Sequence, residues 1–225
     1  MPAFAPDAPR AATLRCAVPP PNQLQFFGAP ELEVLFRDTV AAARTLGWAV
    51  TEVDLSPYFE AGRLLFSGTW VAERYGALRA FAEQSPQSMD PTVGRIVLPA
   101  RDLPAWRAFE DMASLALLQR RMAAVFAAFD VVLIPTCGTC WRIDDVLADP
   151  IGANNANGTY TYGANLLDLC GCAVPAGFQS NGMPAGVTVL GPAFADRLVA
   201  SAGGTLHRAR VSRLGAASDE DMSRR

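Results

Sequence analysis

The sequence predicts an α/β fold in which helices cover both faces of a mixed β-sheet. Strand-like segments alternate with segments of helical spacing along the first half of the chain. The run DVVLIP at 130–135 is wholly apolar after its first residue and lies between a helix and a turn, as is typical of a strand covered on both faces. The apolar stretch 172–192 indicates two strands joined by a turn, which adds an antiparallel return. Together these patterns predict an α/β/α sandwich.

The first half of the chain contains two strands, each followed by helical sequence. A short strand is expected from Thr13, in TLRCAVP, and a helix from Pro30 to Gly47, because proline favours the first turn of a helix. The β-rich segment 48–55 predicts a second strand, and residues 57–83 are largely helical in pattern. The apolar residues that set the spacing of the first helix are Leu32, Leu35, Phe36, Val40 and Ala43.

The second half is expected to contain a long helix, the central strand and a hairpin. Residues 104–129 have helical spacing and lead directly into the DVVLIP strand. Residues 161–169 predict a short helix before the hairpin, in which Asn181 and Gly182 form a turn that tolerates positive φ. A closing helix is expected over 194–209.

The length of 225 residues suits one structured unit, expected over 13–212. Residues 1–12 are rich in proline and alanine and predict a disordered leader, while 213–225 predict a disordered, solvated tail. A net charge of −3 with scattered arginines argues against nucleic acid as a partner. No apolar run reaches the roughly 18 residues needed to span a bilayer, and no export signal precedes the first strand. The sequence therefore predicts a cytoplasmic protein without a membrane partner.

The basic residues exclude several classes of catalyst. All 19 are arginine, so the chain contains no lysine, and it contains one histidine, His207. A lysine base, a Schiff-base lysine and a site of several histidines are therefore excluded, and no cofactor is predicted. His207 falls near the end of the closing helix, where a cation suits the helix dipole, and is interpreted as a surface residue rather than a catalytic one.

Six long segments of the sequence carry a resemblance to a known family. They are LRCAVPPPNQLQFFGAPE (14–31), GWAVTEVDLSPYFEAGRLLF (47–66), WVAERYGALRAF (70–81), DVVLIPT (130–136), GTYTYGANLLDLCGCAVPAGF (158–178) and NGMPAGVTVLGPAFAD (181–196). In this order and spacing they resemble the C-terminal half of the amidase signature family, and within it the allophanate hydrolases. The resemblance covers roughly residues 13–210.

The resemblance implies an amide hydrolase whose catalytic residues lie elsewhere. Members of the family use a serine nucleophile, a second serine in a cis peptide and a lysine base, and no segment here matches the Gly/Ser-rich loop that carries the serines. The expected fold is therefore an incomplete amidase-signature sandwich that lacks its N-terminal catalytic half. The inherited reaction would be hydrolysis of allophanate to ammonia and carbon dioxide, in urea degradation, with no activity expected from this chain alone.

The resemblance also implies one substrate-binding position. Allophanate hydrolases are expected to hold the substrate carboxylate with an arginine in the WVAER-like segment and a tyrosine eight residues earlier. The matching positions here are Arg74 and Phe66, so the guanidinium is retained and the phenol is lost. A planar guanidinium can donate two parallel hydrogen bonds to a carboxylate. The alternative interpretation is that Arg74 forms an ion pair with Glu60, Glu73 or Asp102 on a solvated helix face.

Two further functions stay open at this point. The chain is either such a fragment or a non-catalytic subunit or pseudoenzyme, which binds a small carboxylate such as allophanate or completes a catalytic partner. Expected partners are a second copy of the chain or an N-terminal amidase half, because such a cut would expose strand edges. A third hypothesis is a zinc or redox protein that uses Cys137, Cys140, Cys170 and Cys172, although incidental reduced thiols explain these residues better.

Two other pairs of polar residues have mainly structural interpretations. The neighbouring Asp144 and Asp145 project in different directions and are expected to be acids at a helix start or in a loop. Tyr160 and Tyr162 are two residues apart, and either packing or a place in the pocket wall accounts for them.

Overall fold

A computed structural model of the chain describes residues 14–210, and the predicted disordered ends, 1–12 and 213–225, lie outside the described residues. Its centre is a five-stranded sheet in the order β2-β1-β3-β5-β4. β1 pairs in parallel with β2 and β3, whereas β5 is antiparallel to both β3 and β4. The predicted mixed sheet is therefore confirmed. The strands are β1 (Arg15–Val18), β2 (Ala49–Glu52), β3 (Val131–Pro135), β4 (Leu169–Phe178) and β5 (Pro184–Pro192).

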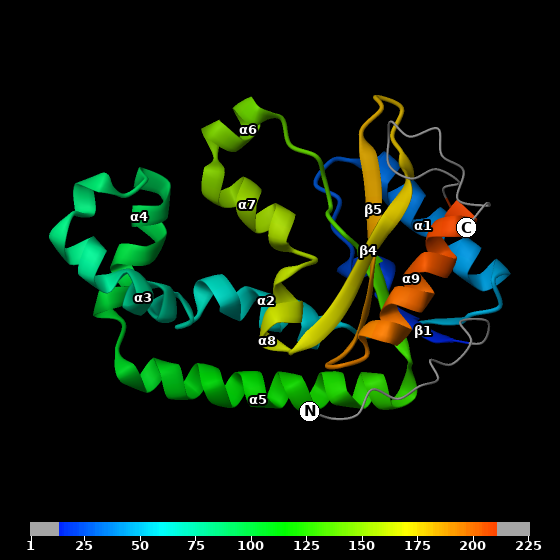
Figure 1. Cartoon of the computed structure of the whole chain (residues 1–225), viewed down its shortest axis with the longest axis horizontal. Helices are drawn as coiled ribbons and strands as arrows, with labels where there is room; N and C mark the ends of the chain where they lie inside the picture. The colour runs from blue at the N-terminus through cyan, green and yellow to red at the C-terminus, as the bar shows by residue number, and fades with distance from the viewer. Residues whose placement is uncertain (1–13, 211–225) are drawn as a thin grey trace.

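Helices cover both faces of this sheet, as Figure 1 shows. Alternate residues of a strand point to opposite faces, so β3 contributes to two cores. Val131 and Leu133 face α1 (Pro30–Thr45) and α9 (Asp196–Arg210), in a cluster that includes Leu32, Phe36, Val40, Val199 and Leu206. Val132 and Ile134 face α2 (Ser56–Ser67) and α5 (Ala105–Ala128), in a cluster that includes Leu55, Tyr58, Leu118 and Met122. Every residue of β3 is buried, which confirms its prediction as the central strand.

The helices between α2 and α5 extend away from the sheet, at the left of Figure 1. They are α3 (Val71–Gln84) and α4 (Pro91–Val97), with the short 3-10 turn η3 (Pro86–Ser88) between them and η4 (Leu98–Asp102) between α4 and α5. α5 runs back beneath the molecule from this extension to β3 (Figure 1). Within residues 14–210, no helix combines the length and apolar character needed to cross a membrane.

The structure divides the segment that the sequence predicted as largely helical over 57–83. α2 ends at Ser67 and α3 begins at Val71. The carboxylate of Asp111, from α5, accepts hydrogen bonds from the backbone N–H of Thr69 at 2.7 Å and from its hydroxyl at 2.9 Å. This bond to a residue 42 positions away anchors the turn between α2 and α3.

The hairpin forms as predicted but starts earlier than residue 172. β4 begins at Leu169 and pairs with β5 as far as Pro192. At the turn, Gly182 has a φ of +81°, which favours glycine, and the backbone N–H of Met183 donates to Asn181 Oδ1 at 2.9 Å. The predicted Asn181–Gly182 turn is thus confirmed. Between β3 and β4 the chain also forms α6 (Ile143–Ala148), α7 (Pro150–Gly158) and α8 (Tyr162–Leu166).

Candidate functional site

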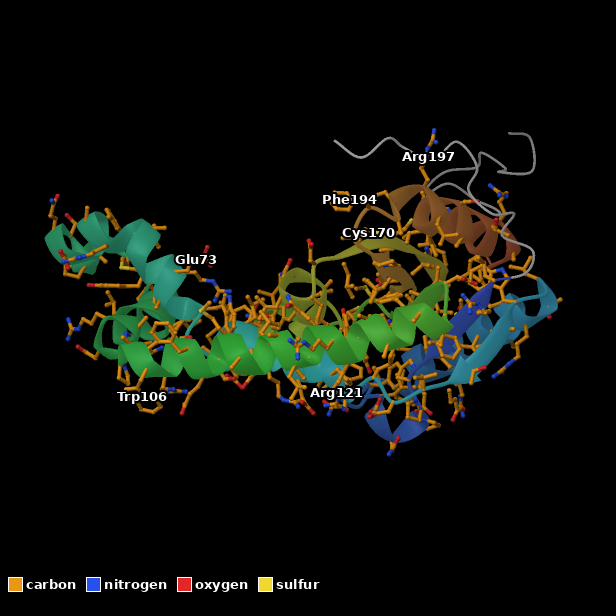
Figure 2. All side chains as sticks on the ribbon, turned by 90° about the horizontal axis from the view of Figure 1, so that it is seen from below. Glu73, Trp106, Arg121, Cys170, Phe194 and Arg197 are labelled. Atoms are coloured by element: carbon orange, nitrogen blue, oxygen red, sulfur yellow. The ribbon has the colours of Figure 1, made fainter. Side chains whose placement is uncertain are left out.

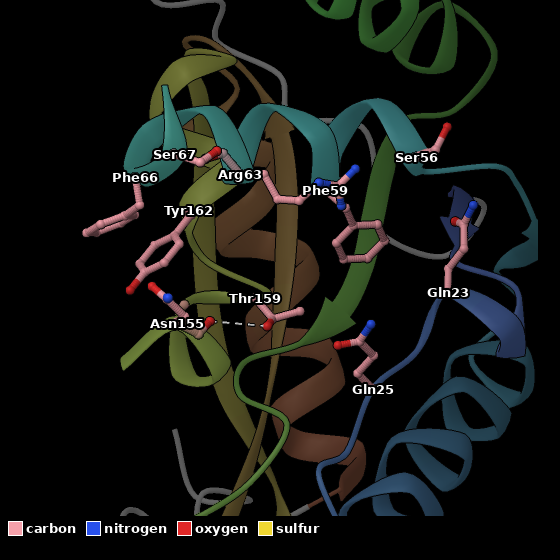
Figure 3. A pocket seen from close by; sticks show the side chains of 12 residues that line it. Gln23, Gln25, Ser56, Phe59, Arg63, Phe66, Ser67, Asn155, Thr159 and Tyr162 are labelled. Carbon is pink, nitrogen blue, oxygen red and sulfur yellow. Dashed lines mark hydrogen bonds between the residues drawn. The ribbon is translucent and has the colours of Figure 1, made fainter. Parts of the chain in front are cut away.

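A cavity of about 510 Å³ opens between α2 and the segment that contains α7 and α8. Figure 3 shows its lining side chains, which come from α2, from α7 and α8, and from the connection between β1 and α1. None of the lining residues is acidic, and Arg63 is the one charged residue among them, beside neutral polar and aromatic side chains. The lining consists of Gln23, Gln25, Ser56, Phe59, Gly62, Arg63, Phe66, Ser67, Asn155, Gly158, Thr159 and Tyr162.

Buried tyrosines hold the walls of this pocket together. The hydroxyl of Tyr160 donates to the Gln25 carbonyl at 2.9 Å and accepts from the Gln25 backbone N–H at 2.6 Å. Tyr58, on α2, donates to the carbonyl of Tyr160 at 2.6 Å. Burial raises the pKa of Tyr160 to about 12, so its hydroxyl stays protonated and able to donate. These bonds join three distant segments of the chain, and Tyr160 is a packing residue rather than a lining one.

The backbones of α2 and α8, which form two walls of the pocket, are in close contact. α2 and α8 cross at Gly62 and Gly163, where a Cβ atom on Gly62 would lie 3.1 Å from the backbone nitrogen of Gly163. A Cβ atom on Gly163 would collide with the carbonyl oxygen of Tyr58. A side chain at Gly163 would therefore push the two helices apart, whereas one at Gly62 would make a tight contact that requires a shift of a few tenths of an ångström.

An aromatic stack with an arginine stands at one end of the pocket. The rings of Phe66 and Tyr162 are 4.3 Å apart between centroids, and both line the cavity. Arg74, from α3, places its guanidinium carbon 4.5 Å from the centroid of Phe66, within the range of a cation–π contact. The structure therefore brings together Arg74 and Phe66, the two residues singled out in the sequence, and adds Tyr162 to them.

Arg74 forms none of the ion pairs proposed as the alternative. Glu60 lies 3.8 Å from Arg121 instead, and Asp102 lies 3.2 Å from Arg101. In the part of the chain that the structure describes, no carboxylate is within ion-pair distance of the Arg74 guanidinium, Glu73 included. The Arg74 charge affects the neighbouring Tyr162. Burial raises the pKa of Tyr162, and the positive charge of Arg74 opposes that rise.

The hydroxyl groups at the pocket are engaged in local bonds. Ser67 donates to the carbonyl of Arg63 at 2.7 Å, and Ser56 donates to Asp54 at 3.0 Å. Thr159 donates to the carbonyl of Asn155 at 3.3 Å, the bond drawn in Figure 3. His207 lies in α9, which packs on the far face of the sheet. No serine–histidine pair is therefore formed at this pocket.

The cysteines fall into separate places, and the four-thiolate zinc site is not formed. Cys137 and Cys140 follow β3, whereas Cys170 and Cys172 lie on β4, with β5 between the two strands. Figure 2 labels Cys170 on β4, and none of the four cysteines is among the residues that line the pocket. Across residues 14–210, no three His, Cys, Asp or Glu side chains are close enough to share a metal ion. Burial also raises the pKa of the Cys137 thiol, whereas a thioredoxin-type cysteine has a lowered one.

Asp144 and Asp145 occupy the first turn of α6, as predicted for acids at a helix start.

Three lining residues, Arg63, Gln23 and Gln25, were not indicated by the sequence. Arg63 lies one helical turn before Phe66, on the same face of α2. This spacing from Phe66 was the signal that could have indicated Arg63 as a pocket residue.

Comparison with known proteins identifies the family. The sequence matches the amidase family over residues 3–200. The chain belongs to the amidase family. Urea amidolyase of Saccharomyces cerevisiae is 35% identical over 178 residues, which is 78% of this chain and 10% of that protein. Urea amidolyase of Lachancea kluyveri is 32% identical over 178 residues, again 78% of this chain and 10% of that protein.

Solved amidase structures share the fold. Allophanate hydrolase of Kluyveromyces lactis superposes with a TM-score of 0.87 at 30% identity, over 96% of this chain and 37% of that one. A bacterial aryl acylamidase of the amidase signature family superposes with a TM-score of 0.68 at 19% identity, over 88% of this chain and 44% of that one, which shows the fold alone. The predicted fold class and the predicted resemblance to allophanate hydrolases are therefore confirmed. The chain spans 10% to 44% of the length of these relatives.

Proposed function

We propose that this chain provides the carboxylate-binding wall of an allophanate-hydrolase type of amidase. The observation that carries the proposal is the Arg74 guanidinium, which is stacked on Phe66 beside a pocket whose lining contains no acidic residue. An allophanate anion requires a cation matched to its carboxylate, and an arginine without a carboxylate partner meets that requirement. The similarity to the Kluyveromyces lactis allophanate hydrolase supports the choice of substrate class.

The contact of Arg74 with Phe66 supports this role, since the guanidinium carbon lies over the ring, 4.5 Å from its centroid. A guanidinium that places one face over an aromatic ring would keep its N–H groups in its own plane, away from that ring. Two of these groups can then donate in parallel to the two oxygens of a carboxylate. Phe66 would thus orient the guanidinium without competing for its donors, and Tyr162 supports the Phe66 ring at 4.3 Å between centroids.

Hydrolysis itself would require groups from outside these 225 residues. The sequence contains no lysine, so the lysine base of the family would have to come from another segment or another chain. Completed in that way, the site would hydrolyse the amide of allophanate and release ammonia and carbon dioxide.

The five cysteines are unpaired, which supports a reducing compartment such as the cytoplasm.

A second candidate, a non-catalytic subunit that completes a partner, is favoured by the sheet edge. β4 is ten residues long and pairs with β5 on one side, while its other edge lies at the end of the sheet. A long unpaired edge can accept a further strand. We propose an N-terminal amidase half or a second copy of the chain as the partner of this edge.

Binding of malonate tests the proposed function, because malonate resembles allophanate in size and in its terminal carboxylate. The folded wild-type chain, alone or with an N-terminal amidase half, should bind malonate weakly in calorimetry, and Arg74→Ala should abolish that binding. Arg79→Ala is the matched control, since Arg79 lies on the same helix and its guanidinium pairs with Glu83 at 2.9 Å. Malonate binding that Arg74→Ala leaves unchanged would refute the assignment.

A further inference from the structure

A second arginine belongs to the pocket itself. Arg63 lines the cavity from α2, and Figure 3 shows its side chain running along the pocket toward Phe59. Arg63 precedes Phe66 by three residues, so the two side chains leave neighbouring points of the same helix face. The Arg74 guanidinium lies at the Phe66 ring, while the Arg63 guanidinium extends in the direction of Phe59. Arg63 is thus a cation of the cavity lining, and Arg74, which is not itself a lining residue, adds a second cation where it contacts the lining residue Phe66.

Both guanidinium groups are available to a ligand. Among residues 14–210, neither Arg63 nor Arg74 has a carboxylate within ion-pair distance, whereas Arg15, Arg79 and Arg121 do. The bond between Ser67 and Arg63 uses the Arg63 carbonyl and leaves its guanidinium free. The lining contains no acidic residue, so Arg63 has no counter-charge within it, and a carboxylate bonded to the lining is that of Asp54, which accepts hydrogen bonds from Gln23 and Ser56.

The size of the cavity and its neutral polar groups also favour a ligand with two polar ends. Its volume of about 510 Å³ lies within the range of pockets that enclose ligands much larger than a small urea derivative. Gln25 lines the cavity beyond Phe59 in Figure 3, and its side-chain amide can donate to an oxygen atom, whereas the Gln23 amide already donates to Asp54 at 2.6 Å. A ligand held only at the Phe66 end would leave Gln25 and Arg63 unused.

We propose that the pocket recognises short dicarboxylates, with one carboxylate at Arg74 and the other at Arg63. This inference rests on the proposed function for the Arg74 end and adds a second anion-binding position to it. A dicarboxylate contains no amide bond, so it is a ligand that competes with an allophanate-like substrate and is not hydrolysed. Compounds of this class would be inhibitors of the completed amidase.

Pairs of ligands that differ only in the second charge test this proposal. Malonate, succinate and glutarate are each compared by calorimetry with the half-amide of the same acid, in which one carboxylate is replaced by an uncharged carboxamide. We expect the best dicarboxylate to bind up to about fivefold more tightly than its half-amide, because a partly exposed ion pair contributes modestly. This preference should decrease as salt is added.

The variants separate the two ends of the pocket. Arg63→Ala should remove the preference for the dicarboxylate and leave the affinity for the half-amide unchanged, and Arg63→Lys should restore part of the preference. Arg74→Ala should abolish the binding of both ligands. Arg37→Ala is the charge-matched control, because Arg37 lies on α1 at the opposite face of the sheet and should have no effect. Circular dichroism verifies that each variant is folded.

The outcomes distinguish this inference from the proposed function. Equal binding of a dicarboxylate and its half-amide, abolished for both by Arg74→Ala, would overturn the role of Arg63 and leave the Arg74 assignment intact. A preference for the dicarboxylate that persists in Arg63→Ala would also overturn it. If the folded wild-type protein binds none of these acids, both proposals fail.

Discussion

Replacing Phe66 removes the cation–π contact of Arg74 and leaves the guanidinium itself in place. Phe66→Leu keeps an apolar side chain of similar size and removes the ring that lies 4.5 Å from the guanidinium carbon of Arg74. A cation–π contact at a partly exposed site contributes about 0.5–1 kcal/mol. We therefore expect malonate to bind about two- to fivefold more weakly to Phe66→Leu than to the wild-type chain.

Phe66→Tyr tests the same site in the opposite direction. It keeps the ring and adds a hydroxyl donor, and a hydrogen bond to a charged group contributes about 1.5–3 kcal/mol. Because Phe66 is partly exposed, the lower end applies, which corresponds to roughly tenfold tighter binding of malonate. Calorimetric titration of the two variants against the wild type gives both values.

Phe66 and Arg74 must also act on the same carboxylate. In a double-mutant cycle with Arg74→Ala, the gain from Phe66→Tyr should largely disappear, since the second substitution removes the charge that holds the ligand. Equal gains in the presence and absence of Arg74 would refute the shared site. No gain in Phe66→Tyr, together with no loss in Phe66→Leu, would show that the ring does not position Arg74.

The remaining predictions concern activity, assembly, thiols and pH. The purified chain should release no ammonia from allophanate above background, because it has no lysine; turnover that survives removal of contaminating amidases would contradict this. The chain should self-associate or bind an N-terminal amidase half in sedimentation experiments, since β4 is an edge strand; a monodisperse monomer that melts cooperatively and binds no apolar-surface dye would argue against it. Thiol titration of the denatured protein should find five free thiols and elemental analysis no stoichiometric zinc; one bound zinc per chain would support the metal hypothesis instead. Burial raises the pKa of Cys16 from 9.0 to about 12, so the unfolded chain loses that proton first, and the free energy of unfolding should fall by about 1.4 kcal/mol per unit between these pH values. Urea titrations across this range should show a shallower fall for Cys16→Ala, and an unchanged slope would be evidence against burial of the thiol.

The parts of the fold that were predictable are those with local signals. The apolar run of β3, the Pro30 start of α1 and the Asn181–Gly182 turn each specify one conformation from a few neighbouring residues. The break between α2 and α3 was not predictable, because it depends on Asp111, which is 42 residues from its partner Thr69. Contacts of that separation leave no periodic pattern in the sequence.

The candidate site shows the same division. Arg74 and Phe66 were found through a motif, and the structure brings them into contact. Nothing in the sequence assigned different roles to Tyr160 and Tyr162. In the structure Tyr160 is buried and bonded to Gln25, whereas Tyr162 lines the cavity. Tertiary packing alone distinguishes the two residues. Arg63 had no signal beyond its distance from Phe66.

The crossing of α2 and α8 at Gly62 and Gly163 has a consequence for how such pockets can diverge. Because α2 and α8 meet through main-chain atoms where Gly163 lies against the Tyr58 carbonyl, their separation at this point does not depend on Arg63 and Phe66, whose side chains line the cavity. Substitutions at Arg63 or Phe66 would then alter the charge and donors offered to a ligand while the distance between the two helices is kept. A new side chain at Gly163 would instead displace α2 from α8 and alter every contact across the pocket together.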